Sequence, residues 1–317
     1  MAKVIKNMGA SVRARLLNVS KERGQNYQLV LTRYANERLL YRLAESVHAD
    51  RFVLKGAVLL MAWFDEPFRG TRDVDLLGHG DPDPAVVLGV FQDILAREGD
   101  DGVRFDAKGA EIGRIREETE YGGLRIKTTA DVGGVRVPIR IDVGFGDATE
   151  PQPEELTLPG LLDMPPAKLR GYARETVIAE KFQAMVALGL TNTRIKDYYD
   201  VWLLSQSFEF DEGQLARAIA ATFERRGTDV PSETPDGLTP AFGEDEAKQR
   251  QWEAFIRDVS FGPGSLQDVV VELSGFLMSI ANVASLLQAS AVTGTPRRAN
   301  SVAGSTAQMD LPQPPWG

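Results

Sequence analysis

The sequence has no cysteine and only two histidines, His48 and His79, in 317 residues. The lack of cysteine excludes disulfide bonds and thiolate metal ligands, and it is compatible with a reducing cytoplasm. The two histidines do not have the spacing of a metal-binding pair, and no Ser-His-Asp arrangement is recognisable. Hydrolysis through a nucleophilic side chain is therefore unsupported.

Long hydrophobic runs are also missing. A membrane-spanning helix needs about 18 consecutive apolar residues. The most apolar stretch, VVVELSGFLMSIANVASLL, is interrupted by Glu272, Ser274 and Asn282, at positions that suit an amphipathic helix. The start, MAKVIKNMGASVRARLL, is basic but lacks a continuous apolar segment and a small-residue cleavage site, so it is not typical of a secretory signal. We expect no membrane contact and a cytoplasmic location.

Positive charge is scarce overall, since the formal net charge is -9, but it is concentrated at the start. A chain of this length and hydrophobicity buries a substantial core, and we expect two domains. Residues 1–50 carry nine Lys or Arg against four acids: Lys3, Lys6, Arg13, Arg15, Lys21, Arg23, Arg33, Arg38 and Arg42 against Glu22, Glu37, Glu45 and Asp50. This region is either a local polyanion-binding face or an ordinary solvated helix surface.

Hydrophobic patterning divides the chain into three regions and a tail. Residues 1–50 have helical spacing and are predicted to pack on the core. Residues 51–150 mix short apolar strands with a helix-like run, which predicts an α/β or α+β core. Residues 151–291 begin with five prolines, interpreted as a linker, and continue as a helical domain. Residues 292–317 are rich in Ser, Ala, Gly and Pro and are predicted to be disordered.

Two carboxylates stand one residue apart in FRGTRDVDLLG. If this stretch is a strand, Asp73 and Asp75 share one face about 6.6 Å apart along the strand. Like charges this close repel unless a cation neutralises them, and Mg²⁺ prefers carboxylate and phosphate oxygens. The pair therefore indicates a metal site for Mg²⁺ or Mn²⁺, although a D-x-D on an exposed strand edge can also be solvated surface.

The flanking sequence extends this pattern. Upstream, LKGAVLL places Gly56 where a strand leads into a helical run, so backbone N–H groups can meet phosphate. Downstream, GLRIKTTADV and VRVPIRIDV flank Gly133-Gly134, which predicts a hairpin carrying Asp142 on its second strand. Asp142 is either a third metal-binding carboxylate or a salt-bridge partner of Arg125 or Arg140. This order matches the nucleotidyltransferase fold, in which carboxylates and two metals align an attacking oxygen with a nucleotide α-phosphate.

Three stretches, in this order, resemble the motifs of one enzyme family. FVLKGAVLLMAWF with RGTRDVDLL is similar to K-G-G-x-x-L followed by R-x-[ST]-x-D-[IV]-D-L. ETVIAEKFQAMVALG resembles a K-[LF]-x-A helix, and TRIKDYYDVWLL resembles an R-x-K-D-x-x-D-[LV] helix. The family is the AbiEii/AbiGii toxin nucleotidyltransferases, which include the mycobacterial MenT toxins. The resemblance runs from about Phe52 to Leu204, and Ala57 replaces the second glycine of the signature.

The resemblance implies roles for matching residues. It implies a DNA polymerase β-like mixed-sheet core with N-terminal helices and a C-terminal helical bundle. The implied catalytic residues are Asp73, Asp75, Lys181 and Asp197, and the implied metal ligands are Asp73, Asp75 and Asp142. The implied nucleotide-binding residues are Lys55, Gly56, Thr71, Arg72 and Asp200, with Arg69 as a further candidate phosphate contact.

Lys181 is also unusual in its own helix. It is the one charged position in the stripe Val177, Lys181, Met185, Leu188, so its ammonium must reach the surface or meet an anion. That anion is either a phosphate of a bound triphosphate or, in a structural role, the carboxylate of Asp197 or Asp200. Asp197 and Asp200 lie at i and i+3 on one helix face. Similarly, Thr71 could donate its hydroxyl to phosphate or serve in a turn.

The resemblance implies a monomeric toxin that transfers a nucleoside monophosphate from an NTP to RNA, with the tRNA 3′ end as the expected acceptor. Such a toxin would block translation, and a cognate antitoxin protein is the expected partner. Two alternatives remain open. One is nucleotidyl transfer to a small molecule or protein hydroxyl, and the other is a catalytically silent module that binds a partner.

Overall fold

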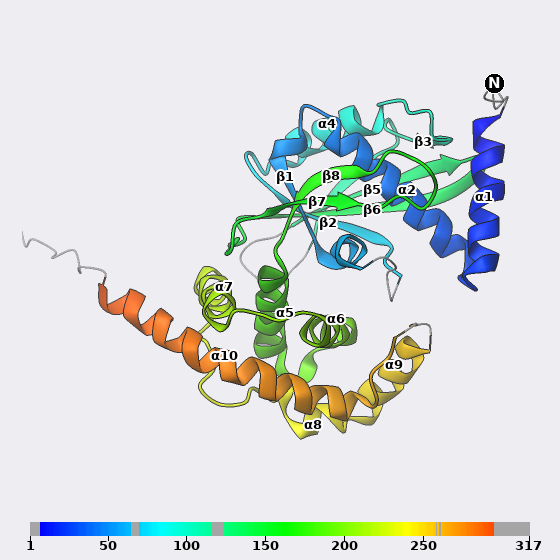
Figure 1. Ribbon diagram of the computed structural model, residues 1–317. Helices are drawn as coiled ribbons and strands as arrows, with labels where there is room; N and C mark the ends of the chain where they lie inside the picture. The colour runs from blue at the N-terminus through cyan, green and yellow to red at the C-terminus, as the bar shows by residue number, and fades with distance from the viewer. Residues whose placement is uncertain (1–6, 65–69, 116–122, 258, 260, 295–317) are drawn as a thin grey trace, which may run out of the picture.

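The computed structural model describes residues 7–64, 70–115, 123–257, 259 and 261–294. A mixed β-sheet forms the first part of the chain, and a group of helices follows it (Figure 1). The helix α4 lies on the side of the sheet away from the C-terminal helices. The predicted α+β class, with a mixed-sheet core and a C-terminal helical bundle, is confirmed.

Two helices precede the sheet, as the spacing of residues 1–50 predicts. They are α1 (Met8–Glu22) and α2 (Tyr27–Ala44). The Asn7 and Asn26 side chains cap them by accepting backbone N–H groups of the first turn. Most of α2 is buried, because it lies between the sheet and the rest of the N-terminal region.

Eight strands form one sheet in the order β3-β5-β6-β2-β1-β8-β7, and β4 also pairs with β5. The strands are β1 (Phe52–Lys55), β2 (Asp73–Gly78), β3 (Val103–Phe105), β4 (Glu111–Arg114), β5 (Leu124–Val132), β6 (Val135–Phe145), β7 (Glu154–Leu158) and β8 (Ala167–Gly171). The β1–β8 and β2–β6 pairs are parallel and the others are antiparallel. The centre of the sheet is therefore β6-β2-β1, and two of these strands carry the predicted acidic residues, Asp73 and Asp75 on β2 and Asp142 on β6.

The hairpin predicted around Gly133-Gly134 is present. Val132 pairs with Val135, and both glycines have positive φ, +58° and +91°. A two-residue loop with two left-handed residues matches the twist of the flanking strands. This turn fixes the register of β5 against β6 and thereby places Arg125 opposite Asp142.

The stretch interpreted as a linker is partly wrong. It contains β7 and β8, so the sheet continues beyond residue 150, where the sequence pattern was divided. The five prolines flank these strands and do not interrupt them, since Pro159 follows β7 and Pro166 precedes β8. Proline lacks a backbone N–H but is tolerated at strand ends, so its frequency here marks the strand boundaries.

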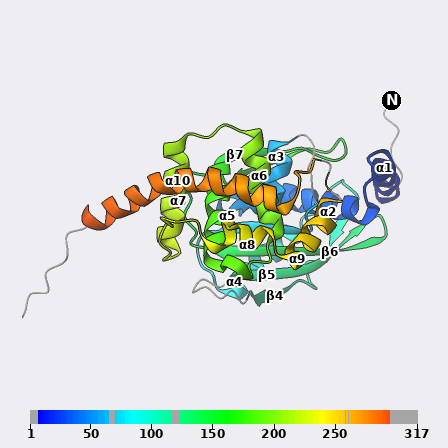
Figure 2. The same cartoon turned by 90° about the horizontal axis from the view of Figure 1, so that it is seen from below.

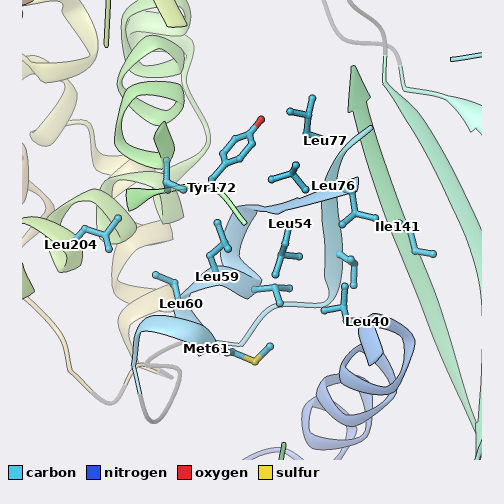
Figure 3. Packing of buried hydrophobic residues seen from close by; sticks show 14 of the residues in the cluster. Leu40, Leu54, Leu59, Leu60, Met61, Leu76, Leu77, Ile141, Tyr172 and Leu204 are labelled. Atoms are coloured by element: carbon cyan, nitrogen blue, oxygen red, sulfur yellow. The ribbon is translucent and has the colours of Figure 1, made fainter. Parts of the chain in front are cut away.

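One part of the hydrophobic core lies on the side of the sheet covered by α2 and α4 (Pro84–Leu95), and the same cluster of buried residues continues into the C-terminal helices. Phe52 of β1 packs against Phe91 of α4 with ring centroids 5.2 Å apart. After β1 the chain turns at Gly56 into the short helices η2 (Gly56–Leu59) and α3 (Leu60–Trp63). Figure 3 shows Leu54 near the β1 turn, with Leu59 and Leu60 of these helices beside it.

The C-terminal helices are α5 (Arg174–Leu188), α6 (Ile195–Ser207), α7 (Glu212–Arg225), α8 (Pro240–Gly243), α9 (Glu246–Ile256) and α10 (Leu266–Gly294). The long α10 crosses the group and contacts α6, α7 and α8 (Figures 1 and 2). It ends at Gly294, two residues after residue 292, the predicted start of the tail. The remainder of that tail, 295–317, lies outside the described residues.

Within the described residues, α10 is the one helix that is long and apolar enough to cross a membrane, with a mean hydropathy of 1.7 over Leu266–Gln288. Its buried positions recur every three or four residues: Leu266, Val269, Val270, Leu273, Leu277, Ile280, Ala281 and Ala284. Glu272 on the same helix accepts a hydrogen bond from Trp202 Nε1 at 2.9 Å. This stripe is typical of a helix packed on one side against other helices.

Candidate active site

Asp73 and Asp75, hereafter the β2 carboxylates, lie on one face of β2, as predicted. Val74 and Leu76 between and beyond them are buried on the other face. The parallel pairing of β2 with β6 puts Asp75 opposite Asp142, and the antiparallel pairing with β1 puts Asp75 opposite Lys55. Paired residues on neighbouring strands face the same side of a sheet. The register therefore brings three acids and one lysine to the same face.

Gly56 lies against this acidic group. It has φ +72°, and a Cβ added there would lie 2.1 Å from Asp75 Oδ2, inside any allowed contact distance. Only glycine combines this backbone conformation with this close approach. The predicted glycine at the end of β1 thus brings the backbone of the β1–η2 turn next to a carboxylate.

Two arginines engage the acids beside Asp75. Arg125 of β5 makes a bidentate pair with Asp142, with donor–acceptor distances of 2.7 and 2.6 Å. Arg140 of β6 lies 3.3 Å from Asp73. The salt-bridge alternative for Asp142 is thus present in this structure with Arg125, while Arg140 pairs with Asp73 instead.

Asp75 itself is in an unfavourable place for a negative charge. Burial, the largest cause, acts together with the charges of Asp142 and Asp73 to raise the pKa of Asp75 to about 6, although the charges of Lys55 and Lys181 oppose the rise. A bound cation would remove this penalty by neutralising the carboxylates.

The β2 carboxylates fit a divalent metal in donor chemistry, because Mg²⁺ and Mn²⁺ take carboxylate oxygens. Among the described residues, however, no group of three His, Asp or Glu converges in metal-binding geometry. The reason is visible in the pairs described above, since Asp142 is turned to Arg125 and Asp73 to Arg140. The feature that favours a cation here is the raised pKa of Asp75, a buried carboxyl group beside two further acids.

Lys55 belongs to a second charged group, the Lys55 cluster, which joins the sheet to α5. Its Nζ lies 2.6 Å from Asp147 and 3.5 Å from Glu180, and Arg226 lies 3.2 Å from the same Glu180 oxygen. The Tyr172 hydroxyl donates weakly to Asp147 and Glu180, at 3.4 Å each. Burial lowers the pKa of Lys55, but the charges of Glu180 and Asp147 outweigh it and raise the pKa above its usual value.

Lys181 forms the α5–α6 triad with Asp197 and Asp200, as the structural alternative predicted. Its Nζ is paired with Asp197 and lies 2.9 Å from Asp200 Oδ2. Asp200 is 1% exposed, whereas Asp197 is 18% exposed. The charge of Lys181 also lowers the pKa of Asp75, so this lysine acts on the β2 carboxylates across the space between α5 and the sheet.

The remaining predicted residues lie at the start of β2. The Thr71 hydroxyl donates to its neighbour, the Asp73 carbonyl oxygen, at 3.4 Å, which supports a role in shaping the turn. Arg72 is exposed, and its carbonyl oxygen accepts a hydrogen bond from Asn36 of α2. Arg69 lies outside the described residues.

Fewer basic residues of the N-terminal region are available to a partner than the sequence suggests. Arg38 pairs with Glu37 at 2.9 Å, Arg42 pairs with Asp101 at 2.7 Å, and both arginines are buried. These two therefore stabilise the fold and do not present charge to a partner. Arg13, Lys21 and Arg23 are exposed, while Lys3 and Lys6 lie outside the described residues.

The sequence patterns missed Asp147, Glu180 and Arg226. Asp147 lies two residues after the end of β6, the strand that carries Asp142, and Glu180 directly precedes Lys181. Their adjacency to singled-out residues is the one signal available in the sequence. Their grouping with Lys55 depends on contacts between distant residues, because Lys55 is 92 positions from Asp147 and 125 from Glu180, and no local pattern shows such contacts.

The model of the family "Nucleotidyl transferase AbiEii toxin, Type IV TA system" matches residues 38–272, which is most of the chain. The chain belongs to the AbiEii family of nucleotidyltransferase toxins. The suspected family is thus confirmed, and its type IV toxin–antitoxin context implies an antitoxin partner. The β2 carboxylates, Gly56 and the α5–α6 triad all lie within the matched residues.

Two solved structures from Helicobacter pylori are distant neighbours. One is JHP933, with 14% identity and a TM-score of 0.44, covering 84% of this chain and 96% of that one. The other is described as a candidate nucleotidyltransferase, with 13% identity and a TM-score of 0.41, covering 84% of this chain and 98% of that one. The comparison with curated proteins gives no significant match. The family assignment therefore rests on the sequence match.

Proposed function

We propose that this AbiEii-family protein transfers a nucleoside monophosphate from an NTP to RNA, with the 3′ end of tRNA as acceptor. The transfer would block translation in the cytoplasm, and the protein would act as a monomer held in check by its antitoxin. One observation carries the proposal. Asp73 and Asp75 share a face with Asp142 and Lys55, and the Asp75 carboxylate lies directly against the backbone of Gly56.

In this proposal Asp73 and Asp75 hold Mg²⁺ or Mn²⁺, and Asp142 joins them if Arg125 releases it. The metal would polarise the α-phosphate and assist departure of pyrophosphate. The backbone N–H groups after Gly56 would approach a phosphate, as at other glycine turns that lead into helices. Lys181 would supply a compact positive charge to the triphosphate, kept in place by Asp197 and Asp200.

The direct test incubates the pure protein with Mg²⁺, total tRNA and each labelled NTP in turn. The proposal is supported if the unaltered protein labels the tRNA 3′ end and the Asp75→Asn variant does not. Active protein that labels a small molecule or another protein, but never RNA, would support the first alternative. No transfer to any acceptor, together with retained antitoxin binding, would support the silent module.

The structure favours an enzyme over the silent module on one point. Burial and two neighbouring acids disfavour the ionised form of Asp75. A module that only binds a partner gains nothing from this cost, because Asn at the same position would pack similarly without the charge. Retention of a costly charge is typical of a functional site.

A further inference from the structure

The open face of the sheet carries a line of cations that leads to the β2 carboxylates. In β6, Arg136 and Arg140 are exposed on the same face as Asp142, while Val137, Ile139 and Ile141 between them are buried on the other. The two arginines are four residues apart, or about 13 Å along the strand. Arg140 is opposite Asp73 in the register, so the line ends at the candidate active site.

Neighbouring strands widen this line. Lys127 of β5 is opposite Arg140 and is exposed, and Arg104 of β3 is exposed beside Asp131, which is opposite Arg136. We define the β6 track as Arg104, Lys127, Arg136 and Arg140. These four cations cover three adjacent strands on one face of a protein whose net charge is -9. Their concentration is therefore local and is not a consequence of overall composition.

A surface hollow adjoins the track at the edge formed by β4. It has a volume of about 400 Å³, and its lining carries three cations, Arg114, Arg125 and Lys127, against one acid, Glu111. Arg125 is opposite Asp142, which is opposite Asp75, so the hollow lies two strands from the reacting carboxylate. Two strand spacings correspond to about 10 Å. The hollow thus offers a concave cationic space beside the carboxylates.

We infer that the β6 track binds the phosphate backbone of the acceptor RNA and guides its 3′ end to the β2 carboxylates. This inference rests on the proposed function for its acceptor, and it adds the surface that receives it. Evenly placed cations along a strand bind phosphates without reading bases, and planar guanidinium groups in the hollow provide surfaces on which an unpaired base stacks. The track is also distinct from the N-terminal basic residues, which the sequence alone suggested as the RNA-binding face.

The test compares the charge reversals Arg136→Glu and Lys127→Glu with the matched control Arg97→Glu. Arg97 is an exposed arginine just after α4, which lies on the opposite side of the sheet from the C-terminal helices. Its reversal changes the net charge of the protein by the same amount as each track variant but leaves the track itself intact. RNA affinity is measured without NTP, over a series of salt concentrations, with tRNA as the probe. Each track variant is expected to weaken binding and to reduce the slope of log K against log salt by about 0.7 to 0.9, as expected for one lost phosphate contact.

Two more measurements separate the track from the catalytic site. In the track variants the KM for tRNA should rise, while the KM for NTP and kcat stay close to those of Arg97→Glu. Melting temperatures and the milder Arg136→Ala variant check that the sheet is intact. RNA affinity and KM equal to those of the control would overturn the track. Absence of transfer by the unaltered protein, with RNA binding still sensitive to these variants, would instead overturn the proposed reaction and leave the binding surface supported.

Discussion

Gly56 and Asp75 are in contact that no other residue at position 56 could make. The Asp75 carboxylate occupies the space where a Cβ at position 56 would lie, at 2.1 Å from Oδ2. The strand pairing of Lys55 with Asp75 fixes this approach, because Gly56 is the next residue along the chain. The turn and the carboxylate therefore depend on each other's position.

Gly56→Ala should abolish transfer and destabilise the protein. The left-handed backbone conformation costs alanine about 1 to 2 kcal/mol, and the new methyl group must also displace the Asp75 side chain. The control is Gly24→Ala, because Gly24 has a similar φ of +61° with open space around its Cβ position. Gly24→Ala should cost the backbone term alone and keep NTP binding. Equal loss of stability in both variants, with transfer retained in Gly56→Ala, would contradict the close contact.

A divalent cation should stabilise the unaltered protein. Mg²⁺ that binds only the folded state raises the melting temperature as its concentration exceeds its dissociation constant. Asp75→Asn removes a ligand and also the buried charge that burial and neighbouring acids disfavour. We therefore expect this variant to melt no lower than the unaltered protein without Mg²⁺, to show no Mg²⁺-induced shift and to lack transfer. Calorimetry with and without Mg²⁺, and Ca²⁺ as a second cation, measures both effects.

The sequence predicts local features of this site better than its connections. The strand with Asp73 and Asp75, the glycine turn and the hairpin at Gly133-Gly134 follow from alternation and turn chemistry, which are local. By contrast, the pairing of Arg125 with Asp142 follows from the register between β5 and β6. The sequence therefore predicts this salt bridge only as one alternative to a metal-binding role for Asp142. The buried ion pair between Arg42 and Asp101 was not predictable either. The spacing of apolar residues in a helix does not show which of its basic residues has a partner far away in the sequence.

Lys181→Met should destabilise the protein as well as impair transfer. The lysine neutralises Asp197 and Asp200, and Asp200 is almost fully buried. Removal of one partner of a buried ion pair leaves an uncompensated charge and costs on the order of 3 kcal/mol. Lys181→Arg should restore little activity, because a planar guanidinium cannot take the place of a compact ammonium between two carboxylates.

The double variant Lys181→Met/Asp200→Asn separates structure from catalysis. It removes the stranded buried carboxylate, so much of the lost stability should return. NTP affinity should remain low if Lys181 contacts the triphosphate. A double variant that is both stable and normal in NTP binding would assign Lys181 a purely structural role. Isothermal titration with a nonhydrolysable NTP, well below the melting temperature, gives the required affinity.

The Lys55 cluster should make stability depend on pH in the acid range. Burial alone would raise the pKa of Asp147, but the charges of Lys55 and Arg226 outweigh it and hold the pKa below its usual value. A carboxyl group whose pKa is lower in the folded state stabilises the fold above its unfolded pKa of about 3.8. That contribution disappears as the pH falls through the lower folded value. Asp147→Asn should therefore be less stable at pH 6 and lose less stability on acidification.

Melting temperatures from pH 6 down to pH 3 measure this effect. Asp163→Asn is the matched control, because Asp163 is an exposed carboxylate in the loop before β8. The unaltered protein and the control should show the same decline at low pH, whereas Asp147→Asn should show a shallower one. Parallel curves for all three proteins would mean that the contact between Lys55 and Asp147, at 2.6 Å, contributes little to stability.

The basic residues of α1, of which Arg13 and Lys21 are exposed and Arg15 is half-buried, should affect the binding of long acceptors and not of short ones. Arg13 donates to the Gly133 carbonyl oxygen at 3.3 Å, so α1 lies at the tip of the β5–β6 hairpin. Val135, at that tip, is seven residues from Asp142, or about 23 Å along the strand. A stacked trinucleotide, with phosphates about 3.4 Å apart along the axis, is too short to reach from the carboxylates to α1.

Reversal of Arg13, Arg15 and Lys21 to Glu should therefore weaken tRNA binding and flatten its salt dependence while leaving a trinucleotide acceptor unaffected. A control with Arg97, Arg217 and Arg250 reversed carries the same charge change on exposed residues of other elements. If the α1 variant and this control bind tRNA equally, the α1 cations are solvated surface. If the α1 variant also loses affinity for the trinucleotide, the RNA does not follow β6. A trinucleotide that lies along β6 from the carboxylates cannot reach α1, so such a loss would require the RNA to bind along a different path.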